Sequence, residues 1–108
     1  MSRVIHVHSE AEWAKVKGEG KPMIVDFTAQ WCGPCQRVAP KYDELSNKYP
    51  DVQFVKVDVD ELNDVAAECG VTAMPTFIGF SGGKEEGRIT GADIAKLEAL
   101  LEKLSGKQ

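Results

Sequence analysis

The sequence predicts an α/β fold, a mixed five-stranded sheet with helices on both faces. Apolar runs of strand length alternate with segments whose apolar residues recur at helical spacing, in the order β-α-β-α-β-α-β-β-α. Early strand–helix–strand units imply parallel pairing. Two consecutive strands near the end, joined by the turn Ser81–Lys84, imply an antiparallel hairpin at the edge of the sheet.

The first three elements follow from local patterns. Val4–His8 reads as a short strand, and Ser9 with Glu12 forms a capping box that starts a helix ended by Gly18 and Gly20. Met23–Phe27 is a nearly continuous apolar run, which is typical of a strand buried on both faces.

The middle of the chain continues the alternation. A helix is expected from about Gln36 to Tyr49, and Pro40 should kink it because proline cannot donate to the preceding turn. Val52–Val59 follows as the third strand. Leu62–Glu68 forms a short helix that Gly70 stops.

The last third supplies the hairpin and a final helix. Thr76–Phe80 and Glu86–Thr90 are the fourth and fifth strands. A helix from about Asp93 to Leu104 has its leucines on one face. Ser105–Gln108 should be a frayed tail.

Length and charge restrict the function. At 108 residues the chain is large enough for one core, so 1–108 is expected to be a single domain. The net charge of −4 argues against nucleic acid or an anionic membrane as partner. There is no apolar stretch of about 20 residues, and no secretory signal is recognisable. Three cysteines suit a reducing compartment, which favours a cytoplasmic location.

Two cysteines stand where the second strand gives way to a helix. Cys32 would lie at the mouth of that helix and Cys35 one turn in, close enough for the sulfurs to join. Unsatisfied N–H groups and the positive end of the helix dipole stabilise a thiolate there. Pro34 is tolerated in a first turn, and Gly33 allows the turn to be tight. This context predicts a reversible dithiol/disulfide pair.

Two other interpretations of the pair are weaker. A structural disulfide does not suit a reducing compartment. Half of a zinc site would need His6 and His8 to complete the ligand set. Both histidines share one face of the first strand, but nothing is expected to bring that strand to the cysteines, so we predict no metal.

Asp26 interrupts the buried second strand, where a carboxylate is costly. It is either a general base for the Cys35 thiol, directly or through a water, or a strand-end carboxylate paired with a lysine or backbone N–H groups. Desolvation should raise its folded-state pKa.

Two further features have ordinary interpretations. Cys69 is expected to be a small buried apolar residue. The acidic run that starts at Asp58 does not fit a calcium loop, because its sixth residue is Asn63 instead of glycine. It is predicted to be a solvated loop that leads into a helix.

The stretch Trp31-Cys32-Gly33-Pro34-Cys35, preceded by Val25-Asp26-Phe27, resembles the thioredoxin family, and the resemblance covers almost the whole chain. It implies the thioredoxin fold and protein-disulfide reductase activity of the cytosolic, eukaryotic-like kind. The Cys32 thiolate would attack a target disulfide, and Cys35 would then resolve the mixed disulfide. No bound cofactor is implied. The implied partners of this monomer are disulfide-containing proteins and a thioredoxin reductase, NADPH-dependent or ferredoxin-linked.

The resemblance also implies roles for individual residues. Asp26 would be the base and Lys56 its neighbour on the third strand. Pro75 would follow a cis bond and face the disulfide. Cys69 matches a thiol that some relatives can oxidise or modify, whereas Ala73 replaces a cysteine through which certain relatives dimerise. A substrate-docking surface would consist of Trp31, Gly33, Pro34, Met74, Pro75 and Gly91.

Three rival functions remain. Oxidases and isomerases of the protein disulfide isomerase type carry histidine in place of Pro34, and glutaredoxins usually carry Pro-Tyr between the cysteines. The third rival is a binding module, such as a subunit that clamps a larger enzyme, in which the redox pair is incidental.

Overall fold

The computed structural model describes residues 1–106, and the element order in that range is the predicted one. Within 1–106 no helix is long and apolar enough to cross a membrane. The elements are β1 (Ile5–Val7), α1 (Glu10–Gly18), β2 (Met23–Thr28), α2 (Gly33–Lys48), β3 (Gln53–Asp58), α3 (Asn63–Glu68), β4 (Thr76–Ser81), β5 (Lys84–Thr90) and α4 (Ile94–Ser105).

The five strands form one sheet in the order β1-β3-β2-β4-β5. β1 and β2 both run parallel to β3, whereas β2–β4 and β4–β5 are antiparallel, so the predicted mixed sheet is confirmed. β2 lies at the centre. Its residue Asp26 is in register with Lys56 of β3 on one side and Phe77 of β4 on the other.

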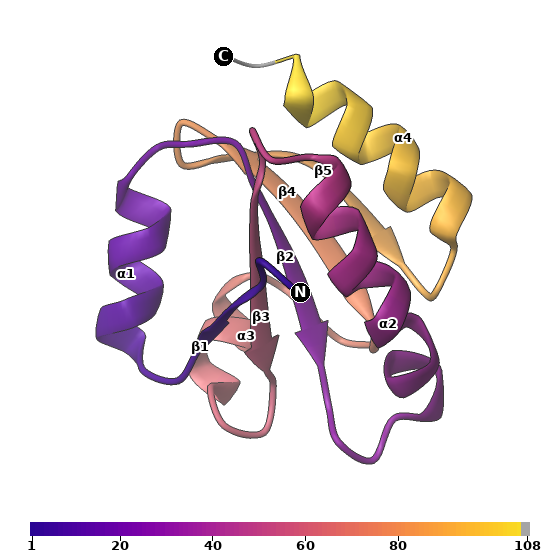
Figure 1. Ribbon diagram of the computed structural model, residues 1–108. Helices are drawn as coiled ribbons and strands as arrows, with labels where there is room; N and C mark the ends of the chain where they lie inside the picture. Colours follow the sequence, from indigo (N-terminus) through magenta and orange to yellow (C-terminus); the bar gives the residue numbers. More distant parts are fainter. Residues whose placement is uncertain (107–108) are drawn as a thin grey trace.

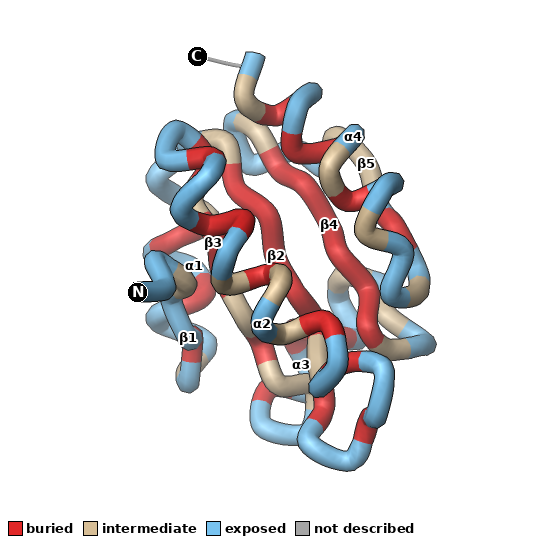
Figure 2. Tube along the Cα trace, turned by 45° about the vertical axis from the view of Figure 1, so that its right-hand side comes forward, coloured by how far each residue is buried: buried red, intermediate tan, exposed pale blue. Residues whose placement is uncertain are grey.

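Helices cover both faces of the sheet, with α1 on one side and α2 and α4 on the other (Figure 1). β2 and β4 are buried along most of their length (Figure 2). Each face has its own apolar cluster because side chains alternate along a strand. On the α1/α3 side the cluster includes Trp13, Val16, Val25, Phe27, Val55, Val65 and Ile78. On the α2/α4 side it includes Ile24, Val38, Tyr42, Phe54, Phe77, Leu97 and Leu101.

Helix starts follow the sequence signals. Ser9 caps α1, with its hydroxyl accepting from the Glu12 amide at 3.1 Å. The Glu12 carboxylate accepts from the backbone N–H of His8 at 3.1 Å, one residue before the donor that a capping box usually supplies. α2 begins at Gly33, three residues before the prediction, because Pro34 fits a first turn and Cys32 acts as the cap.

A few boundaries differ from the prediction. β5 starts at Lys84, so the turn is only Gly82-Gly83. Their φ angles of 60° and 79° are those a tight hairpin turn requires and favour glycine. α4 extends to Ser105, so the predicted frayed tail is wrong for that residue; positions 107 and 108 lie outside the described residues. Pro40 lies within α2, and its kink stays a prediction.

Candidate functional site

The two cysteines meet where β2 leads into α2. Cys32 has extended backbone (φ −88°, ψ 110°) and caps the helix, and its sulfur accepts from the Cys35 amide at 3.3 Å. Cys35 lies in the first turn. The two residues form a disulfide with their Cα atoms 5.3 Å apart, which confirms that the spacing brings the sulfurs together. Gly33 is not among the glycines with a left-handed φ, so its backbone angles do not by themselves require glycine.

The disulfide is almost buried but is edged by exposed residues. Cys35 is 1 % exposed and Cys32 is 5 % exposed, so Cys32 is the more accessible of the two residues. Ala29, Val59 and Met74 pack around the pair. A target disulfide can therefore approach from the Cys32 side, where Gly33, Pro34 and Trp31 are exposed.

The start of β4 lies against this sulfur. The Met74–Pro75 bond is cis, as the resemblance implies. The Met74 carbonyl oxygen lies 3.6 Å from Cys32 Sγ. The Pro75 carbonyl accepts from the Gly91 amide at 2.8 Å, and Gly91 has a φ of 104° that favours glycine. The structure thus brings Met74, Pro75 and Gly91 together at one edge of the disulfide.

Trp31 is 69 % exposed, yet its ring is tied down. Its indole N–H donates to Asp60 Oδ2 at 2.8 Å. Asp60 is held in turn, because the Asp58 carboxylate accepts from its amide at 2.8 Å. We predicted only a solvated loop here. No sequence signal joins residues 31 and 60, which meet because β2 and β3 end side by side.

Asp26 is 1 % exposed, and within residues 1–106 neither of its carboxylate oxygens has a hydrogen-bond partner. Burial raises its pKa to about 7, the Lys56 ammonium opposes that rise, and Asp43 adds to it. The predicted direction is confirmed. The alternative of a strand-end carboxylate bound to backbone N–H groups does not match these unpartnered oxygens.

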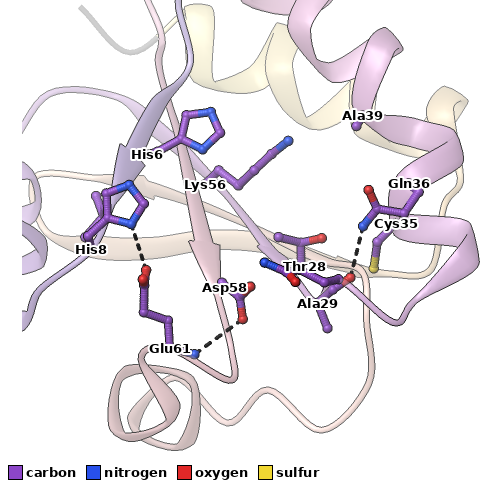
Figure 3. Close-up of a pocket in the computed structure, with 12 residues that line it drawn as sticks. His6, His8, Thr28, Ala29, Cys35, Gln36, Ala39, Lys56, Asp58 and Glu61 are labelled. Carbon is purple, nitrogen blue, oxygen red and sulfur yellow. Dashed lines mark hydrogen bonds and ion pairs between the residues drawn. The ribbon is translucent and has the colours of Figure 1, made fainter.

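A cleft of about 260 Å³ reaches Cys35 from the side of β1 and β3 (Figure 3). His6 and His8 line the cleft together with Cys35. Cys32 does not line it, and within 1–106 no cluster of His, Cys, Asp and Glu could hold a metal ion. The other lining residues include Thr28, Gln36, Lys56, Asp58 and Glu61.

One histidine of the cleft has a clear partner. His8 Nδ1 lies 2.8 Å from Glu61 Oε1, and this contact raises the pKa of His8. The pair joins the end of β1 to the loop before α3. Both side chains of this pair are largely exposed, and exposed ion pairs stabilise proteins only weakly. We therefore assign the pair a minor structural role.

Cys69 lies away from the disulfide. It ends α3 and packs, half-buried, against the α1/α3 cluster instead of the residues around Cys32. Its carbonyl accepts from Arg88 at 2.7 Å, and burial raises the pKa of its thiol. Among residues 1–106 it is the cysteine outside a disulfide. Its packing is apolar, as predicted, but it is only half-buried, so the expected full burial is wrong.

The chain is similar to many characterised proteins. A sequence model of the family described as Thioredoxin matches residues 4–105. Thioredoxin-1 of Schizosaccharomyces pombe is 46 % identical over 98 residues, which are 91 % of this chain and 95 % of that protein. A Thioredoxin H-type of Chlamydomonas reinhardtii is 49 % identical over 105 residues, covering 93 % of each chain. The crystal structure of thioredoxin NaTrxh from Nicotiana alata superposes with a TM-score of 0.92 at 48 % identity, covering 94 % of this chain and 92 % of that one.

Proposed function

The chain belongs to the thioredoxin family, and we propose that it works as a cytoplasmic protein-disulfide reductase. A thioredoxin reductase returns it to the dithiol form, and Asp26 assists the second step of its reaction. Reduction itself proceeds by dithiol/disulfide exchange through Cys32 and Cys35. The observation that carries the function is this disulfide at the N-terminus of α2, facing the loop of Pro75.

The first step forms a mixed disulfide. The Cys32 thiolate attacks one sulfur of the target disulfide, the target S–S bond breaks, and the other target sulfur leaves as a thiolate. The Cys32 thiolate is stabilised by its place at the helix N-terminus, where the Cys35 amide points at its sulfur from 3.3 Å.

The second step regenerates the disulfide. Cys35 loses its proton and attacks Cys32 Sγ, the bond to the target breaks, and the second target sulfur is released. Two electrons pass to the target, and two protons end on its thiols. A base near Cys35 speeds this step. Asp26 suits the role because a carboxyl with a pKa of about 7 can both accept and release a proton near neutral pH.

The docking surface surrounds Cys32 on two sides. Trp31, Gly33 and Pro34 flank it along the chain, and Met74, Pro75 and Gly91 flank it from the start of β4 and the end of β5. The Met74 backbone lies beside the sulfur, so an extended segment of the target can pair with it as an added strand does.

The electron source is proposed from the family. The cysteines carry both electrons, so the reaction needs no bound cofactor. In an assay with NADPH, a eukaryotic thioredoxin reductase and insulin as the disulfide target, NADPH oxidation should depend on this chain. Absence of NADPH oxidation, with a thioredoxin of the family active in the same mixture, would contradict the proposed donor.

Removing the Trp31 ring should weaken target docking. We expect Trp31→Ala to raise the KM for insulin by about fivefold to thirtyfold, because a buried aromatic contact contributes on the order of 1–2 kcal/mol. The rate with a small aromatic disulfide should change less. Trp13→Phe is the matched control, because Trp13 is buried under α1 and should affect stability alone. An unchanged KM for Trp31→Ala would remove that residue from the docking surface.

A further inference from the structure

Asp26 faces the helices α2 and α4. Its neighbour two positions earlier, Ile24, packs on that side, and side chains two apart in a strand share a face. Register places Lys56 on one side of Asp26 and Phe77 on the other. The helix α2 lies above this face, and Tyr42 is one of the residues that it buries there.

The Tyr42 ring contacts the neighbours of Asp26. It is fully buried, with its centroid 5.1 Å from that of Phe54 and 5.6 Å from that of Phe77. The Lys56 ammonium nitrogen lies over the ring, 6.0 Å from its centroid. This distance is within the range in which a cation is attracted to the face of an aromatic ring.

The Tyr42 hydroxyl is committed to the backbone. It donates to the Val55 carbonyl at 2.7 Å and to the Ile24 carbonyl at 3.1 Å. These carbonyls belong to β3 and β2, just before Lys56 and Asp26. Burial and the Asp26 carboxyl hold the pKa of Tyr42 well above its usual value, so the hydroxyl stays a donor. Its single proton serves the carbonyls and is not offered to Asp26.

We propose that Tyr42 is a positioning residue of the redox site: its ring holds the Lys56 ammonium beside the Asp26 carboxyl, and its hydroxyl ties β2 to β3 beneath that pair. A lysine side chain is long and flexible, and Lys56 is only half-buried. Without the ring, its ammonium is free to move into the neighbouring cleft, which Lys56 also lines (Figure 3). The attraction between Lys56 and Asp26 would then weaken.

The test is a double-mutant cycle read on Asp26 itself. The carboxyl carbon of Asp26 is titrated by NMR in the folded oxidised protein, in Tyr42→Leu, in Lys56→Met and in the double variant. The charged groups facing Asp26 are Lys56 from β3 and Asp43 from α2. We expect Tyr42→Leu to raise the titration midpoint of Asp26 by about half a pH unit when Lys56 is present. When Met replaces Lys56, the same substitution at position 42 should leave that midpoint unchanged.

Tyr42→Phe separates the ring from the hydroxyl. Phenylalanine keeps the aromatic face, so the coupling to Lys56 should persist, whereas the unfolding midpoint should fall because two carbonyls lose their donor. If Tyr42→Leu does not fold, Tyr42→Met replaces it in the cycle. The proposal would be overturned if Tyr42→Leu changed the titration midpoint of Asp26 equally with and without Lys56, or did not change it at all.

This inference rests on the proposed function only for its effect on rate. If Asp26 is the base, the pH profile of target reduction should follow the same cycle. If the coupling between Tyr42 and Lys56 is seen in the NMR titration but not in the reduction rates, Tyr42 is still a positioning residue, and the proposed role of Asp26 as base fails.

Discussion

Cys35→Ser should stop turnover and leave the chain covalently attached to its target. Cys32 can still attack, but without the second thiol the mixed disulfide has no internal route to release. We expect reduction of insulin in the NADPH-coupled assay to fall by at least about 1,000-fold, because the lost group is a reactant. Mass spectrometry should find the target joined to Cys32.

The other cysteine variants complete this experiment. Cys32→Ser should abolish both turnover and trapping, because Cys35 is 1 % exposed and cannot reach a target sulfur. Cys69→Ser is the matched control and should retain turnover, since Cys69 packs in the α1/α3 cluster. Trapping through Cys35 in the Cys32→Ser chain would reverse the assignment of the two sulfurs. Full biological effect without either cysteine would favour a clamp over a reductase.

Asp26→Asn should stabilise the fold at neutral and alkaline pH. Burial raises the pKa of Asp26 from 3.8 to about 7, so the unfolded chain loses this proton first. The resulting penalty is absent below pH 3.8, grows up to about pH 7 and stays constant above it. At 1.36 kcal/mol per pH unit it reaches at most about 4 kcal/mol.

The buried amide of asparagine needs partners of its own, and the cost of leaving it without them is the same at every pH. Between pH 4 and pH 8, the difference in unfolding free energy should therefore move in favour of the variant by about 4 kcal/mol, whatever that constant cost is. Urea unfolding of both chains at each pH measures it, and groups common to both cancel. A difference that is constant with pH would show that Asp26 ionises normally in the folded protein.

The same substitution should slow the second chemical step. In the original chain, release of target from the Cys32 mixed disulfide should speed up as Asp26 loses its proton near pH 7. In Asp26→Asn that rise should disappear, and the rate at pH 8 should fall by about tenfold or more. Formation of the mixed disulfide should be little affected. An equal loss in both steps would point to a disturbed site instead of a missing base.

Much of the fold could be predicted because its signals are local. The capping residues of α1, the apolar run of β2 and the leucine face of α4 each depend on neighbours within a few positions. The cysteine pair is also local, since both members belong to one helix start. Asp26 stood out because an ionisable residue in a buried strand is rare.

The unpredicted features depend on strand order. Once β3 lies between β1 and β2, the loop after β3 comes beside Trp31, and His8 comes beside Glu61. The position of the Tyr42 ring under the Lys56 ammonium likewise could not be read from the sequence. Nothing in the spacing of residues along a chain fixes which strands become neighbours, so contacts between these loops and helices needed the structure.

The reduction potential of the Cys32–Cys35 pair decides whether this chain gives electrons to its targets or takes them. Equilibration against glutathione or dithiothreitol buffers, with the two states separated after thiol labelling, gives the value. We expect a potential more negative than about −250 mV, near the value of about −270 mV that is typical of thioredoxins, so that electrons flow from this chain to targets. A potential near about −180 mV, as in protein disulfide isomerase, would contradict the reductase and make the chain an oxidant or isomerase.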